Sequence, residues 1–169
     1  MADRRYWDSC AFLGWLSNEQ GKAEKCEGVL DAAESGSIEI VTSALTLTEV
    51  IKRKGDKPIP KESEDKIREF FENPWIIVRD VDRFIAEDAR NLIWAHSGLS
   101  SPDSIHLATA LSLKLSHLDT FDDKLIALSG KLGNPRLVIG HPNVPHTPDM
   151  FPGTKPTTPR PAKRKKKGR

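Results

Sequence analysis

The chain has 169 residues, of which 37% are hydrophobic and 30% are charged, a composition typical of one soluble globular domain. No apolar run reaches the roughly 18 residues that a membrane span needs, and the N-terminus lacks the apolar stretch of a signal peptide. The two cysteines, Cys10 and Cys26, fit neither a disulfide framework nor a zinc site. The composition therefore favours a cytoplasmic protein in a reducing compartment, without a membrane association.

The formal net charge of +2 conceals two regions of opposite sign. From residue 152 onward the chain carries eight Lys or Arg and no acid, so residues 1–151 hold 18 basic against 24 acidic residues. We expect residues 1–140 to form the globular domain and the proline-rich basic residues 141–169 to be a disordered tail. Binding of RNA phosphates, a plain solubilising extension and a localisation signal all remain open for the tail. The basic residues suited to RNA are Lys163, Arg164, Lys165, Lys166 and Lys167.

The predicted elements alternate between strands and helices along the chain. Short apolar runs predict strands at 4–7, 38–41, 75–78, 117–119 and 137–139. Apolar residues at helical spacing predict helices at 11–16, 22–35, 42–55, 61–72, 82–96, 101–115 and 124–129. The third of these helices would begin with Thr42 or Ser43 as its cap and stop near Gly55, before a loop at 56–60. Such alternation predicts an α/β fold with a parallel sheet covered by helices on both faces.

Several acids stand among apolar neighbours, as Glu49 does inside its predicted helix, or where strands are expected to end and helices to begin. An open parallel sheet binds its ligand outside the carboxyl ends of its strands, at a switch in strand order. Carboxylates that meet there repel one another, so the cluster needs a counter-charge. An all-oxygen set suits Mg²⁺ or Mn²⁺, which can polarise a phosphoryl group and activate water. The acids in question are Asp8, Glu49, Asp103, Asp119, Asp122 and Asp123.

Each acid also has an ordinary interpretation. Asp8 is suited to cap the first helix, and Glu49 to face solvent. Asp103 follows Ser101 and Pro102 at a strong helix start, where its charge favours the positive end of the helix dipole. The pair at 122–123 fits a turn and a cap. The joint pattern is therefore more informative than any single acid.

Four short motifs over residues 4–140 occur in a fixed order. They read Tyr-Trp-Asp8-Ser9, Leu-Thr-Glu49-Val, Pro-Asp103-Ser-Ile-His-Leu-Ala-Thr-Ala and Thr120-Phe-Asp122-Asp. In order and spacing these motifs resemble those of the PIN-domain nucleases, in particular the VapC-type toxins of toxin–antitoxin pairs. The resemblance implies a three-layer α/β/α PIN-like fold with a short-stranded parallel sheet.

The resemblance also implies a chemistry and a set of roles. It implies a metal-dependent endoribonuclease that uses Mg²⁺ or Mn²⁺, acts on RNA, forms a homodimer and binds a cognate antitoxin. The acidic quartet carried over from the family is Asp8, Glu49, Asp103 and Asp122, with Asp8 and Asp103 as metal ligands. Ser9 and Thr120 carry over as supporting polar groups. Asp119 and Asp123 are further candidates, because the position of the fourth acid varies in the family.

Two other functions fit parts of the pattern. A receiver-type phosphoacceptor domain would need an acidic doublet after its first strand and a Lys after its last strand. Here the first strand ends in a single acid, Asp8, and the last is followed by Gly140-His141. A PIN-like fold that binds nucleic acid or protein without catalysis is the other alternative. The histidines at 96, 106 and 117 are interpreted as structural, since none has a metal-binding neighbour in the sequence.

Overall fold

A computed structural model describes residues 2–51 and 60–144 of the chain. It contains one five-stranded sheet, in which all neighbouring strands are parallel and the order is β3-β2-β1-β4-β5. The strands are β1 (Asp3–Trp7), β2 (Ile38–Ser43), β3 (Ile76–Arg79), β4 (His117–Asp119) and β5 (Val138–Gly140). The expected parallel sheet of short strands is confirmed.

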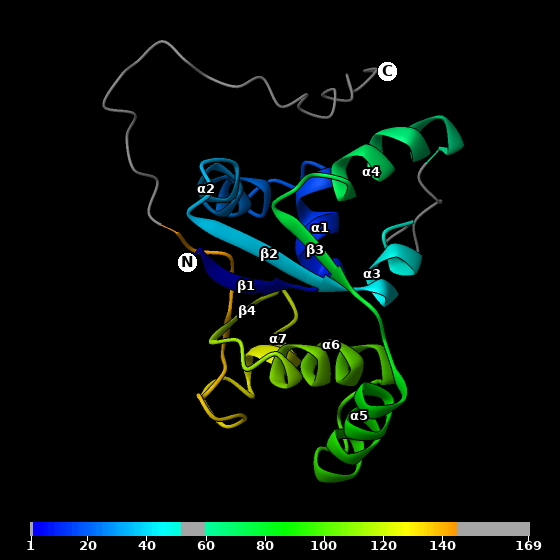
Figure 1. The fold of residues 1–169 in the computed structure, drawn as a ribbon, viewed down its shortest axis with the longest axis vertical. Coiled ribbons are helices and arrows are strands. Elements are labelled where there is room, and N and C mark those ends of the chain that lie inside the picture. The colour runs from blue at the N-terminus through cyan, green and yellow to red at the C-terminus, as the bar shows by residue number, and fades with distance from the viewer. Residues whose placement is uncertain (1, 52–59, 145–169) are drawn as a thin grey trace, which may run out of the picture.

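Helices cover both faces of this sheet. They are α1 (Ser9–Leu16), α2 (Ala23–Glu34), α3 (Ala44–Glu49), α4 (Glu64–Phe71), α5 (Arg83–Ala95), α6 (Ser101–Ser112) and α7 (Asp123–Ile126), with a 3-10 turn at Lys61–Ser63. Figure 1 shows α1, α2 and α4 on one face of the sheet and α5, α6 and α7 on the other. The predicted three-layer α/β/α architecture is therefore confirmed. In the part of the chain that the structure describes, none of the helices has the length and apolarity that crossing a bilayer requires.

The core is divided into two layers because successive strand residues point to opposite faces of the sheet. Trp7 packs with Phe12 on α1 and with residues of α2 and α4, whereas its neighbour Tyr6 packs with Leu107 on α6 and Leu125 on α7. Both strand residues are fully buried. This two-sided burial explains why the strands read as short apolar runs.

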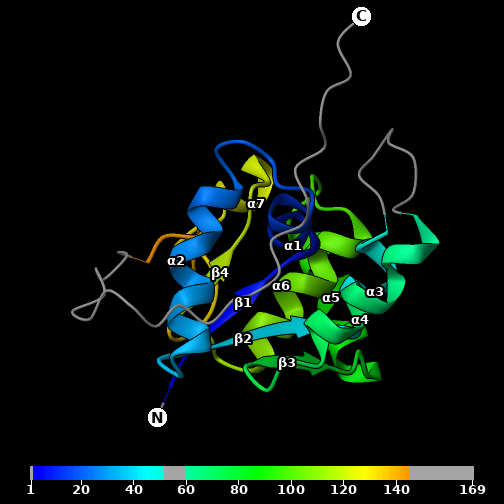
Figure 2. The same ribbon diagram turned by 90° about the horizontal axis from the view of Figure 1, so that it is seen from above.

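The strand order places a topological switch beside β1. From β1 the chain adds β2 and β3 on one side and later returns to add β4 and β5 on the other. At the carboxyl end Trp7 pairs with Asp119, so the loops after β1 and β4 start side by side. Figure 2 shows β1 leading into α1 and β2 leading toward α3. Open α/β sheets bind ligands at this kind of position.

Some element boundaries differ from the sequence prediction. Helix α6 is capped by Ser100 rather than Ser101, because the Ser100 side chain accepts a hydrogen bond from the Asp103 backbone. Its C-cap is Leu113, and Lys114 then adopts a φ of +52°, which ends the helix before residue 115. Helix α3 is a short helix of six residues, and Val50 leaves the helical region. The expected helix stop near Gly55 lies outside the described residues.

The described chain continues to pack on the domain after β5. Pro142 is buried, and Val144 is half-buried against the core cluster that contains Trp7. The basic run from Lys163 to Lys167 lies outside the described residues, so its expected role stays a prediction.

Candidate active site

Asp8 is a buried carboxylate at the switch point of the sheet. Its Oδ1 accepts a hydrogen bond from the Ala11 backbone at 3.0 Å, which caps α1, and its Oδ2 accepts one from the Thr120 hydroxyl at 2.5 Å. The residue is only 2% exposed. Burial raises the pKa of Asp8 to about 6; attraction to His106 and the two hydrogen bonds oppose the rise, and repulsion from Asp122 adds to it. Ionised Asp8 is therefore costly, and a nearby cation would reduce the cost.

Thr120 connects the loop after β4 to the start of α1. Its hydroxyl donates to Asp8 and accepts a hydrogen bond from the Asp122 backbone at 2.9 Å. Asp122 in turn caps α7, since its Oδ1 accepts from the Lys124 backbone at 2.7 Å. One fully buried hydroxyl thus holds two of the predicted acids in a fixed relation. Asp8 and Asp122 therefore cap α1 and α7, and both are also candidate site residues.

Glu49 is held by a residue that the sequence analysis left outside the site. His106 Nε2 lies 2.8 Å from Glu49 Oε2, and His106 itself is 2% exposed. Burial works to raise the pKa of Glu49, but hydrogen bonds from His106 and Ser9 and attraction to His106 outweigh it, so the pKa is lowered. Glu49 therefore does not face solvent as a free charge. The sequence did contain one indication that His106 is near the site, because it lies three residues after Asp103 and so on the same face of the helix.

Asp103 lies in the first turn of α6, where Ser100 donates a hydrogen bond to its Oδ2 at 2.6 Å. The Cys10 thiol on α1 shows that this carboxylate lies near the others. Burial raises the pKa of Cys10 to about 12, and Asp8, Asp122 and Asp103 each add to the rise. Three acids from three separate segments therefore act electrostatically on one atom. Glu49 is connected to this group through His106, which lies on α6 with Asp103 and also attracts Asp8. A single site made by all four acids stays a prediction.

Asp119 and Asp123 have different surroundings. The Asp119 carboxylate is 1% exposed and accepts hydrogen bonds from Arg5 Nη2 at 2.5 Å, Arg5 Nε at 2.8 Å and Trp7 Nε1 at 3.0 Å. Those donors occupy the carboxylate and Arg5 neutralises its charge. We therefore assign Asp119 a structural role, in which its side chain connects β4 to β1, rather than a place in the quartet. Asp123 is exposed in the first turn of α7, where an acid favours the helix dipole.

The donor set fits a hard divalent cation. All four quartet side chains offer oxygen, the ligand type that Mg²⁺ and Mn²⁺ prefer. Across residues 2–51 and 60–144, no three His, Cys, Asp or Glu side chains are already arranged to hold a metal ion. Mg²⁺ commonly keeps several waters and uses only one or two protein carboxylates. Asp8 and Asp103 are the candidates for direct ligands, and the burial of Asp8, which raises its pKa to about 6, is the observation that favours the fit.

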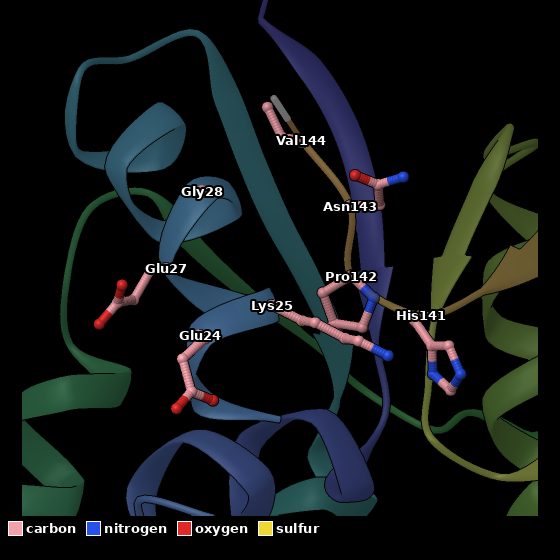
Figure 3. Close-up of a pocket in the computed structure, with 8 residues that line it drawn as sticks. All are labelled: Glu24, Lys25, Glu27, Gly28, His141, Pro142, Asn143 and Val144. Atoms are coloured by element: carbon pink, nitrogen blue, oxygen red, sulfur yellow. The ribbon is translucent and has the colours of Figure 1, made fainter. Parts of the chain in front are cut away.

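A pocket of about 470 Å³ lies away from the quartet, between α2 and the chain after β5 (Figure 3). Lys25 extends toward Pro142 and His141, whereas Glu24 and Glu27 point away from that segment. None of the four quartet acids lines this pocket. We therefore assign it no part in the candidate chemistry.

Comparisons with known proteins agree with the geometry. The family model described as the PIN domain matches residues 5–131, a range that contains the whole quartet. The crystal structure of VapC20 from Mycobacterium tuberculosis, described as a Sarcin-Ricin loop cleaving toxin, is a similar solved structure. Its TM-score is 0.56 at 14% sequence identity, over 72% of this chain and 92% of that chain, which shows a shared fold. The comparison with curated proteins found no match.

Proposed function

Because the chain belongs to the PIN domain family, we propose that it is a metal-dependent endoribonuclease and the toxin of a toxin–antitoxin pair. The observation that carries the proposal is the buried carboxylate of Asp8, whose pKa burial raises to about 6 beside Asp122. A nuclease site of this kind would be completed by Mg²⁺ or Mn²⁺. The family match also excludes the receiver-type alternative considered above.

The side chains of this chain divide the work in the proposed reaction. Asp8 and Asp103 would hold the ion, which when bound would polarise the scissile phosphate. Thr120 fixes the orientation of Asp8 through its hydroxyl. Glu49 and Asp122 complete the acidic set and orient the attacking water. We expect in-line attack of water on phosphorus, with a 5′-phosphate and a 3′-hydroxyl as the products.

The partners in this proposal are an RNA substrate, a second copy of the chain and a cognate antitoxin. VapC20 is described as cleaving the Sarcin-Ricin loop, which supports RNA as the substrate class here. The basic residues Lys163 to Lys167 would add affinity through phosphate contacts. Deletion of residues 152–169 should then flatten the salt dependence of RNA binding, as measured by fluorescence anisotropy at several salt concentrations.

Cleavage of labelled RNA by the purified full chain tests the proposal directly. We expect cleavage in Mg²⁺ or Mn²⁺, none in EDTA, and loss of cleavage in Asp103→Asn. Asp123→Asn is the matched control, because Asp123 is an exposed acid outside the quartet. Circular dichroism confirms that each variant is folded. A folded Asp103→Asn that cleaves as fast as the wild type contradicts the proposal, and RNA binding without cleavage in the wild type would favour the non-catalytic alternative.

A further inference from the structure

Three side chains from separate elements form a continuous hydrogen-bonded series that ends at the quartet. The Tyr6 hydroxyl on β1 lies 2.8 Å from His106 Nδ1, and His106 Nε2 lies 2.8 Å from Glu49 Oε2. Tyr6 and His106 are 0% and 2% exposed, whereas the Glu49 side chain is 25% exposed. The series therefore runs from the core of the domain to the partly open site.

The imidazole ring of His106 is fixed at both nitrogens. An ionised carboxylate can only accept hydrogen bonds, so the nitrogen that faces Glu49 must carry the proton. Tyr6 engages the other nitrogen, and the two rings also pack edge to face with centroids 5.8 Å apart. Burial raises the pKa of Tyr6 above its ordinary value, so the phenol keeps its proton. The ring therefore presents Nε2 to the site in one orientation.

Glu49 needs such support because of its place in the chain. It is the last residue of α3, a helix of only six residues, and Val50 already leaves the helical conformation. A long side chain at a helix end has several rotamers open to it. The contact with His106 at Oε2 selects one of them and leaves Oε1 unbound by His106. A hydrogen bond from Ser9 adds a second contact from the start of α1.

We propose that His106 is a positioning residue: it clamps Glu49 through Nε2, Tyr6 sets the ring, and the clamp holds the second Glu49 oxygen toward the metal and water of the site. This inference rests on the proposed nuclease function and deepens it. Removal of a residue that orients a carboxylate of a metal site changes metal affinity or activity by about 10- to 100-fold. RNA affinity measured without metal should not change, because His106 is buried.

Substitutions at His106 separate the clamp from simple packing. His106→Leu removes the donor while keeping a buried side chain, whereas His106→Gln can still donate from a nitrogen near the position of Nε2. We expect His106→Leu to weaken Mn²⁺ binding, followed by electron paramagnetic resonance, and single-turnover cleavage by about 10- to 100-fold. His106→Gln should recover most of the loss. Equal behaviour of the two variants, or wild-type values in His106→Leu, overturns the inference.

Two further measurements keep the test independent of folding and of activity. Tyr6→Phe deletes one hydroxyl and leaves the core filled, and we expect it to weaken Mn²⁺ binding and cleavage in the same direction by a smaller factor. In metal-free wild-type protein, ¹⁵N NMR of the imidazole should show a protonated Nε2, and an unprotonated Nε2 overturns the clamp. Absence of Mn²⁺ binding and cleavage in the wild type would instead refute the proposed function, and the NMR result would still decide the geometry.

Discussion

Two buried carboxylates at neighbouring strand ends show how this domain treats negative charge. Asp119 ends β4 with 1% exposure, and Asp8 follows β1 with 2% exposure. Arg5 neutralises Asp119 with two hydrogen bonds, whereas the hydrogen-bond donors to Asp8 are a backbone amide and the Thr120 hydroxyl. The protein supplies its own cation for one carboxylate, which makes it a structural group. Burial raises the pKa of both carboxyl groups, but among the described residues no Arg or Lys forms an ion pair with Asp8, whose pKa of about 6 is a common property of functional groups.

The largest expected difference between the two carboxylates is in catalysis. Asp8→Asn should lower the cleavage rate roughly a thousandfold, since it removes a charge that the proposed metal needs. The variant keeps an oxygen that can cap α1, so it should stay folded. Single-turnover cleavage of labelled RNA at saturating Mg²⁺ measures the effect. A folded Asp8→Asn with near wild-type cleavage would show that Asp8, like Asp119, is a structural group.

The free energy of unfolding should depend more on Asp119 than on Asp8. Asp119→Ala leaves Arg5 buried without its partner, which typically costs about 3 to 5 kcal/mol. The matched control is Glu39→Ala, which breaks the exposed Arg4–Glu39 pair between β1 and β2 and should cost less than about 1 kcal/mol. Urea unfolding gives both free energies. Equal losses in the two variants would show that burial of the Arg5 pair has no structural consequence.

Local patterns drew attention to Asp8, Asp103 and Asp122 because each stands at an element boundary, whereas Glu49 was expected inside a helix. The quartet itself came from the family resemblance and stays a prediction. The sequence could not predict the partners of those acids. Arg5 and Asp119 are 114 residues apart, and Glu49 and His106 are 57 residues apart, so their contacts depend on strand order and helix placement. His106 looks like an ordinary polar residue of an amphipathic helix until α3 is placed beside it. The sequence placed the cap of α6 at Ser101, whereas the structure has it at Ser100, because adjacent serines are equally good caps in the sequence.

The burial of Asp8, which its hydrogen bonds and His106 offset only in part, should appear as a pH-dependent cost in folding free energy. Its folded-state pKa of about 6 lies above the ordinary value of an unfolded Asp, so the protonated form favours folding. That contribution is present at low pH and is lost as the pH rises through about 6. In metal-free protein at pH 7.5, Asp8→Asn should therefore be more stable than the wild type, by up to about 3 kcal/mol for a rise of about two pKa units.

Urea unfolding at pH 4 and pH 7.5, in the presence of EDTA, measures this cost. The advantage of Asp8→Asn should be largest at pH 7.5 and should shrink at pH 4, where Asp8 is protonated in the folded wild type. A wild type that is more stable than Asp8→Asn at pH 7.5 without metal would mean that the surroundings of Asp8 already stabilise its charge, which contradicts this prediction.

The smallest expected effect concerns the two adjacent acids of the β4–α7 loop. Asp122 caps α7 through its side chain, so Asp122→Ala should lower stability by about 1 kcal/mol. Asp123 is exposed, and Asp123→Ala should change stability by less than about 0.5 kcal/mol. Thermal unfolding of both variants in EDTA distinguishes them. Equal destabilisation would argue against the capping geometry at Asp122.

We propose that a divalent cation from solution binds near Asp8 at the switch point of the sheet and neutralises its charge. Isothermal titration of Mn²⁺ into the metal-free full chain tests it most directly, with Asp8→Asn and Asp123→Asn titrated in parallel. We expect saturable Mn²⁺ binding by the wild type and by Asp123→Asn, and at least tenfold weaker Mn²⁺ binding by Asp8→Asn. No saturable binding by the wild type, or identical binding by all three proteins, would contradict it.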